Sequence, residues 1–75
     1  MKTLHQNNSA LGGYGYRALL DKDRVKLQER HNGGRWKTIR TVGLSEFDAF
    51  AESVNLYDAY NDDPAHLAHF TNQLY

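Results

Sequence analysis

Hydrophobic and polar positions alternate from residue 14 to residue 41, and this period of two predicts β-strands. The alternation is broken at Asp21-Lys22-Asp23 and again at Asn32-Gly33-Gly34, two clusters of residues that favour turns. Because short turns join antiparallel neighbours, we expect a three-stranded antiparallel meander. The predicted strands span residues 14–20, 24–31 and 35–41.

Side-chain pairing selects a register for the second hairpin. A three-residue loop pairs Leu27 with Ile39, whereas a two-residue loop pairs Leu27 with Arg40. The three-residue loop also sets Glu29 opposite Lys37. We favour it, because it places an apolar residue opposite an apolar residue and a carboxylate opposite an ammonium group.

The register also assigns each side chain to a face of the sheet, because a one-residue slip would exchange the faces. A tight turn in the first hairpin gives two pairs, Leu20 with Val25 and Ala18 with Leu27. The predicted core face carries Tyr16, Ala18, Leu20, Val25, Leu27 and Ile39. The opposite face, which we call the outer face, carries Arg17, Leu19, Lys26, Gln28, Arg30, Trp36, Thr38 and Arg40.

Two helices are predicted after the sheet. The first begins at Leu44-Ser45, with Ser45 as N-cap and Asp48 in the capping-box position. The second begins with Asp63 as cap and Pro64 at the first helical position. Apolar residues at helical spacing should cover the core face of the sheet, namely Phe47, Phe50, Ala51, Val54 and Tyr57 in the first helix and Leu67, Phe70 and Leu74 in the second. The predicted fold is α+β, in the order βββαα with both helices on one face.

Length and composition indicate one small domain. The chain has 75 residues, near the size at which a single core barely offsets the entropy of ordering the chain. We assign residues 14–75 to this domain and residues 1–13, rich in Asn and Gln, to a flexible N-terminal arm. The chain lacks cysteine and any long apolar run, which predicts a cytoplasmic protein with neither disulfides nor a membrane span.

Charge is divided sharply along the chain. All 9 Lys and Arg residues lie between Lys2 and Arg40, against three acidic residues there, Asp21, Asp23 and Glu29. From Thr41 onward the charged residues are all acidic: Glu46, Asp48, Glu52, Asp58, Asp62 and Asp63. The formal net charge of zero therefore conceals a strongly polarised molecule, which we expect to meet a charged partner.

The outer face combines cations with the tryptophan, as nucleic-acid-binding surfaces often do. Cations hold phosphates, an indole ring stacks on bases, and a β-ribbon fits the major groove, where Arg reads guanine and Gln reads adenine. We predict a non-catalytic nucleic-acid-binding protein, with DNA preferred over RNA. The alternative is an ordinary solvated face, with Trp36 beneath the aliphatic parts of Arg side chains. The predicted contact residues are Arg17, Lys26, Gln28, Arg30, Trp36, Thr38 and Arg40.

Three segments carry a further signal: Tyr16-Arg17-Ala18, residues 34–43 and Tyr57-Asp58. In these segments, and in the order of three strands followed by a helix, the chain is loosely similar to the AP2-type and integrase arm-binding domains. This resemblance implies a sheet that reads DNA. The loop lengths and helix spacing of the chain depart from that pattern.

The acidic second half supports a different hypothesis, a small inhibitor of a host nucleic-acid-processing protein. Carboxylates along a helix can imitate a phosphate backbone, and small phage proteins of the anti-CRISPR class resemble this chain in size and charge. The predicted interface is Glu46, Asp48, Glu52, Asp58, Asp62 and Asp63. Capping and the helix dipole already favour four of these carboxylates, which leaves Glu52 and Asp58 as the informative ones.

Two further possibilities follow from charge and composition. The basic sheet of one copy could meet the acidic helices of another, which predicts salt-sensitive homo-oligomers. His66 and His69 lie three apart, yet two histidines on the polar side of a short helix are usually solvated, so we expect no metal site. The serines and glycines lack the motifs of a nucleophile or a phosphate loop. We therefore expect neither an enzyme nor a cofactor.

Overall fold

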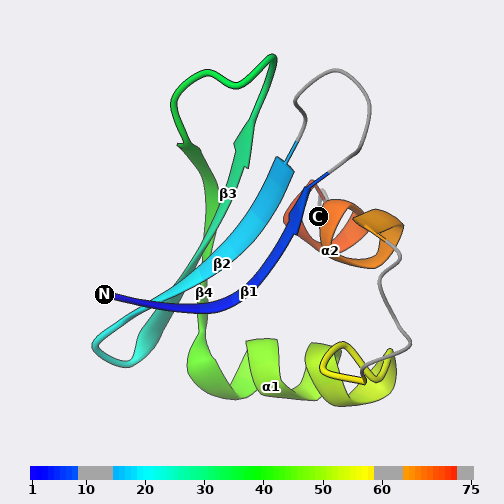
Figure 1. Ribbon diagram of the computed structural model, residues 1–75. Helices are drawn as coiled ribbons and strands as arrows, with labels where there is room; N and C mark the ends of the chain where they lie inside the picture. The colour runs from blue at the N-terminus through cyan, green and yellow to red at the C-terminus, as the bar shows by residue number, and fades with distance from the viewer. Residues whose placement is uncertain (9–14, 59–63, 73–75) are drawn as a thin grey trace.

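The computed structural model describes residues 1–8, 15–58 and 64–72, which form an antiparallel four-stranded sheet and two helices (Figure 1). The strand order follows the chain, β1-β2-β3-β4. The elements are β1 (Lys2–Asn8), β2 (Gly15–Asp21), β3 (Arg24–Arg30), β4 (Lys37–Gly43), α1 (Leu44–Ser53) and α2 (Pro64–Thr71).

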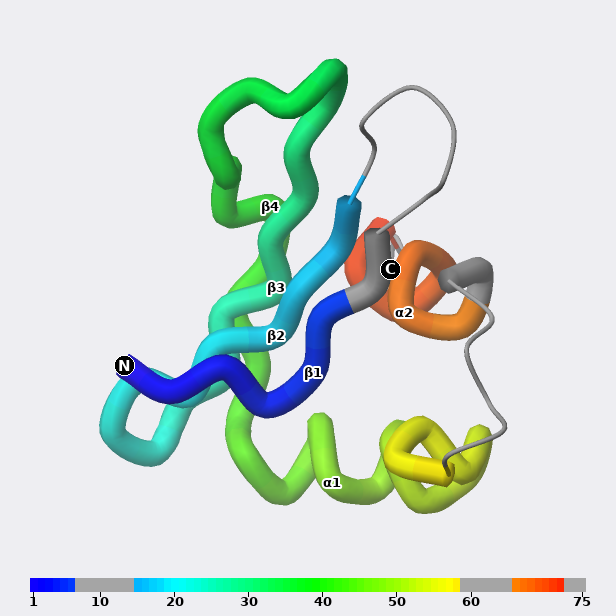
Figure 2. The backbone as a smooth tube through the Cα atoms, in the orientation of Figure 1, coloured from blue at the N-terminus to red at the C-terminus, as the bar shows by residue number. Residues whose placement is uncertain are grey.

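Both helices cover the same face of the sheet. Helix α1 packs against β3 and β4, and α2 packs against β1 and β2 (Figures 1 and 2). The α+β class and the antiparallel sheet agree with the sequence analysis, but the number of strands does not. The sheet has four strands where three were predicted.

The additional strand is β1, within the segment predicted to be an arm. It pairs with β2 along its length, from Lys2 opposite Leu20 to Asn8 opposite Gly15. Leu4 is the one apolar residue of β1, so hydrophobic alternation could not reveal the strand. Its backbone hydrogen bonds with the edge of β2 define it instead, and these join residues distant in sequence. The rest of the predicted arm, residues 9–13, lies outside the described residues.

Strands β2 and β3 pair as predicted, with Leu20 opposite Val25 and Ala18 opposite Leu27. The second hairpin agrees with the prediction only in part. Glu29 lies opposite Lys37, but Leu27 lies opposite Arg40.

The irregularity is a β-bulge at Ile39. The register shifts by one residue between Leu27 and Gln28, which leaves Ile39 as the extra residue of β4. Beyond the bulge, the alternation of β4 is reversed relative to the predicted one. Val42, 3% exposed and opposite Val25, is therefore the buried residue of β4, whereas the predicted core residue Ile39 is only half-buried.

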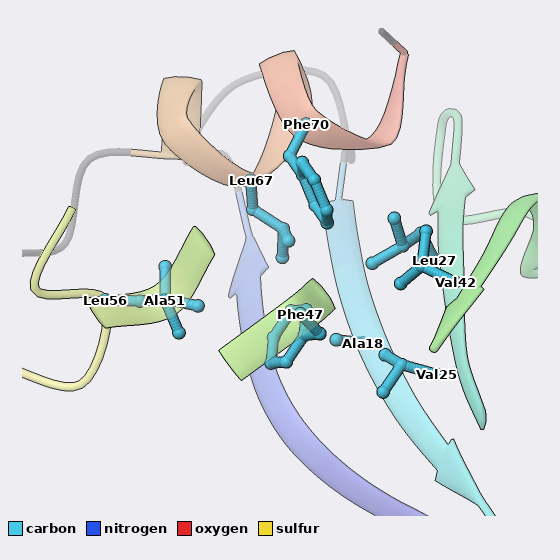
Figure 3. Close-up of a cluster of buried hydrophobic side chains, with 9 residues drawn as sticks. All are labelled: Ala18, Val25, Leu27, Val42, Phe47, Ala51, Leu56, Leu67 and Phe70. Carbon is cyan, nitrogen blue, oxygen red and sulfur yellow. The ribbon is translucent and has the colours of Figure 1, made fainter. Parts of the chain in front are cut away.

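The core lies between the sheet and the two helices (Figure 3). It consists of Ala18, Val25, Leu27, Val42, Phe47, Ala51, Leu56, Leu67 and Phe70. Aromatic stacking joins the two helices beside this core, because the rings of the half-buried Phe50 and of Phe70 lie with centroids 4.2 Å apart and planes 5° from parallel. Each large apolar side chain contributes about 1.5–3 kcal/mol on full burial, so this small cluster supplies much of the stability.

The first helix has its N-cap two residues earlier than predicted. Gly43 is the N-cap, no side chain caps the helix, and the predicted cap Ser45 is already in its first turn. The Leu44 amide donates a hydrogen bond to the Asp23 carbonyl oxygen at 3.2 Å. Because β4 runs directly into α1, the end of the strand sets the start of the helix.

The end of α1 is a Schellman motif. Asn55 adopts a left-handed conformation with φ of 50°. The Asn55 amide donates to the Glu52 carbonyl, and the Leu56 amide donates to the Ala51 carbonyl at 2.9 Å. The turn breaks the helical period, so Leu56, 2% exposed, enters the core. The prediction of Tyr57 as a core residue was wrong, since 58% of it is exposed.

The second helix begins at Pro64, as predicted. Leu67 and Phe70 are buried against the sheet and α1, which confirms their assignment to the core. The predicted cap Asp63 and the predicted core residue Leu74 lie outside the described residues.

Replacement of Leu56 by alanine tests the Schellman end of α1. We expect Leu56→Ala to lower the free energy of unfolding by about 2–5 kcal/mol, because it opens a cavity in the core. Tyr57→Ala, the adjacent control, should cost under about 1 kcal/mol, as for most exposed positions. Urea titrations followed by circular dichroism measure both. A larger loss of unfolding free energy for Tyr57→Ala than for Leu56→Ala would contradict the assignment of Leu56 to the core.

Candidate nucleic-acid interface

Three of the predicted outer-face residues form one contact group. Arg17 comes from β2, Arg30 from the end of β3, and Trp36 from the residue before β4. The guanidinium carbon of Arg17 lies 4.3 Å from the Trp36 ring centroid, and that of Arg30 lies 4.7 Å from it. We call this group the arginine–tryptophan cluster. Each contact has the geometry of a cation–π interaction.

A tight turn at residues 31–34 precedes Trp36 and helps to position it. The Gly34 amide donates to the His31 carbonyl at 2.8 Å. The two central residues, Asn32 and Gly33, have φ of 53° and 68°. Positive φ at both positions is typical of the type I′ turn, for which Asn-Gly is the preferred sequence.

Next to this turn, the two strands contribute different numbers of residues, and this difference sets the orientation of Trp36. Between the turn and the Glu29–Lys37 pair, β3 contributes Arg30, whereas the returning chain contributes Arg35 and Trp36. Two residues thus lie opposite one, as in a bulge. Trp36 can then meet the side chain of Arg30 instead of continuing a regular ladder.

A row of hydrogen bonds crosses the sheet beside the cluster. The Arg17 Nε donates to Gln28 Oε1 at 2.7 Å, and Gln28 Nε2 donates to Thr38 Oγ1 at 2.9 Å. Since arginine can only donate, the Gln28 amide has one orientation here. Gln28 is thus committed to its neighbours on both sides, and the predicted bidentate contact with adenine would require these bonds to break.

The electrostatics of the cluster are those of two neighbouring like charges. Burial lowers the pKa of the Arg17 guanidinium, and the Arg30 charge lowers it further. Within residues 1–8, 15–58 and 64–72, neither arginine forms an ion pair with a carboxylate. An anion that contacted both groups would replace repulsion by attraction.

Lys26 shares the outer face but lies apart from the cluster. Its Nζ is 3.3 Å from the Asp21 carboxylate. It lies opposite Leu19, which is buried although neither α1 nor α2 covers this face. Lys26 therefore compensates an acidic charge and covers apolar surface, in addition to any contact with a ligand.

Arg40 lies on the other face of the sheet, because the bulge at Ile39 reverses the alternation. Its Nη1 donates to the Phe70 carbonyl at 3.0 Å, and its Nη2 lies 3.2 Å from Glu46 Oε1. Its guanidinium carbon is 5.0 Å from the Phe70 ring centroid. Arg40 thus holds α2 and the first turn of α1 against β4, apart from the other predicted contact residues.

The acidic residues of the alternative hypothesis are also divided by the structure. Glu46 is paired with Arg40, and Asp62 and Asp63 lie outside the described residues. The other three, Asp48, Glu52 and Asp58, are exposed and line a shallow hollow of about 380 Å³ at the end of α1.

Tyr57 shares this hollow, which sequence reasoning did not identify. Partial burial raises the pKa of the Tyr57 hydroxyl, and the Asp48 carboxylate raises it further. The edge of the His5 ring meets the Tyr57 ring at 6.0 Å between centroids. The signal in the sequence was Asn55, a residue that tolerates the left-handed conformation and so ends the helix before Tyr57.

Two absences can be stated for the part of the chain that the structure describes. No three side chains of His, Asp or Glu come together there in a way that could hold a metal ion. No helix there has the length and apolar character needed to cross a bilayer.

No protein-family model, curated protein or solved structure matches the chain. The similarity to AP2-type and integrase arm-binding domains therefore remains an observation on short segments. The geometry of the outer face carries the functional argument.

Fluorescence of Trp36 tests the cluster directly, because this is the single tryptophan of the chain. Arg17→Ala should move its emission to longer wavelength, since water replaces a guanidinium group against the ring. The stability loss should be about 1–3 kcal/mol, because the variant loses a half-buried cation–π contact and the hydrogen bond to Gln28. Lys26→Ala, a control on the same face, should leave the emission unchanged. An unchanged spectrum for Arg17→Ala would argue against the packing.

Proposed function

We propose that this protein binds nucleic acid through the outer face of its sheet. The observation that carries the proposal is the arginine–tryptophan cluster, two guanidinium groups held against one indole ring on the helix-free face. No described carboxylate pairs with either group. A like-charged pair without a carboxylate partner favours an anionic ligand that can contact both members.

Phosphate diesters fit this chemistry. A guanidinium group donates two parallel hydrogen bonds to phosphate oxygens, and Arg17 is oriented by its bond to Gln28. Further cations, the exposed Arg35 and Lys37, flank Trp36 in the chain. Their charge would add counterion release to binding, which makes affinity depend on salt.

Charge reversal in the cluster is the direct test. The Arg17→Glu, Arg30→Glu double variant should lose measurable binding to fluorescein-labelled DNA and RNA oligonucleotides in anisotropy titrations, because both phosphate contacts become repulsive. With neutral Arg17→Gln, Arg30→Gln, the slope of log affinity against log salt should fall by about 1.4, or 0.7 for each single-strand phosphate contact.

The matched control is Lys22→Glu, Arg24→Glu, which changes the net charge equally at the far end of β3. Arg24 is six residues from Arg30, about 20 Å at roughly 3.3 Å per residue. This variant should keep most of the affinity. Equal losses in the two charge-reversed variants would mean that overall charge, and not the cluster, determines binding.

The exposed Tyr57 favours a second candidate, an inhibitor that engages a host nucleic-acid-binding protein through its acidic helical side. Tyrosine is one of the residues that contribute most to binding at the centre of protein interfaces. Here Asp48, Glu52 and Asp58 line the same hollow, and an acidic rim would suit a basic, nucleic-acid-binding partner.

Glu52→Lys, Asp58→Lys separates the two candidates. It should abolish capture of a nucleic-acid-binding partner by the immobilised protein and leave oligonucleotide affinity intact or raised, because both substitutions add positive charge away from the cluster. A partner captured equally by the wild type and this variant would exclude the acidic surface as its binding site.

A further inference from the structure

We infer that the outer face takes single-stranded nucleic acid, laid flat across the sheet, without reading its sequence. This inference rests on the proposed function and specifies its ligand. Three features carry it: the width of the sheet, the hydrogen bonds already made by Gln28, and the planar groups of the cluster.

The width of the sheet disfavours a duplex. The major groove is about 12 Å wide and admits a two-stranded β-ribbon. The cluster and its hydrogen-bonded row draw on β2, β3 and β4, and β1 continues the sheet beyond β2. Because neighbouring strands lie about 4.8 Å apart, the axes of the two edge strands, β1 and β4, are roughly 14 Å apart. The whole four-stranded face is therefore wider than the groove and cannot enter it as a two-stranded ribbon does, whereas a flexible single strand can lie across it.

The side-chain amide that could read adenine is already engaged. Gln28 accepts from Arg17 on one side and donates to Thr38 on the other. Base discrimination needs side chains whose donors and acceptors are free to meet the pattern of a base pair. The contacts that remain for a ligand on this face are therefore mainly with guanidinium charge and planar surfaces, which do not distinguish one base from another.

The cluster supplies those flat surfaces. Guanidinium and indole groups both stack on unpaired bases, and every base has a face that can stack. The N–H edges of the Arg17 and Arg30 guanidinium groups can bind phosphates, while bases stack on the indole surface that these groups leave uncovered and on the guanidinium planes that face away from the ring. Stacked single strands thus use charge and aromatic surface together, which a paired duplex cannot do.

Oligonucleotides of matched length test the inference. Anisotropy titrations compare oligo-dT, oligo-dA, an abasic strand and a mixed-sequence duplex, each about ten nucleotides long, within the usual site size of one small domain. The normal strands should bind at least about fivefold more tightly than the abasic strand, and more tightly than the duplex. Oligo-dT and oligo-dA should bind within about fivefold of each other, because stacking is sequence-tolerant.

Substitution of the indole ring assigns the stacking to Trp36. Trp36→Ala should remove most of the difference between normal and abasic strands, and Trp36→Phe should retain part of it. The abasic comparison with the wild-type protein decides the question even where Trp36→Ala does not fold. Equal affinity for normal and abasic strands, or tighter binding of the duplex, would overturn the inference. Absence of binding to every oligonucleotide at low salt would instead overturn the proposed function.

Discussion

The extra residue Ile39 in β4 determines which side chains of the last strand face the helices. On one side of the bulge, Thr38 takes part in the polar row of the outer face. On the other side, Arg40 and Val42 turn toward α1 and α2. A one-residue slip exchanges the faces of a strand, so the bulge divides β4 between the outer face and the core. Without it, Val42 would leave the core and Arg40 would join the cations outside.

Because it faces the helices, Arg40 connects β4 to both α1 and α2. Its guanidinium group meets the Phe70 ring and carbonyl from β4, Phe70 stacks on Phe50, and Glu46 completes the contact from α1. One cation thereby joins the last strand to both helices at the edge of a small core. Because a 75-residue chain buries little apolar surface, such a contact matters more here than in a larger domain.

The outer face is organised differently, around charges that repel. Arg17 and Arg30 share one indole ring, and the Arg30 charge contributes to the lowered pKa of Arg17. Cation–π contacts and the hydrogen bond to Gln28 offset this repulsion within the domain. An arrangement that holds like charges together fits a role in binding anions better than a role in stability. The acidic side, with Tyr57 in its hollow, lies on the other side of the core, at the end of α1.

The sequence by itself determined the features that depend on near neighbours. Alternation and tight turns predicted the pairing of Leu20 with Val25 and put Arg17, Gln28 and Trp36 on one face, and Pro64 marked the start of α2. Only the tertiary structure decided the features that depend on distant contacts. Strand β1 exists through backbone pairing with β2, Arg40 turned inward because of a register shift against β3, and Leu56 replaced Tyr57 in the core after a left-handed Asn55. Hydrophobic periodicity describes one segment at a time, whereas bulges, edge pairing and helix ends are settled by hydrogen bonds and packing between segments.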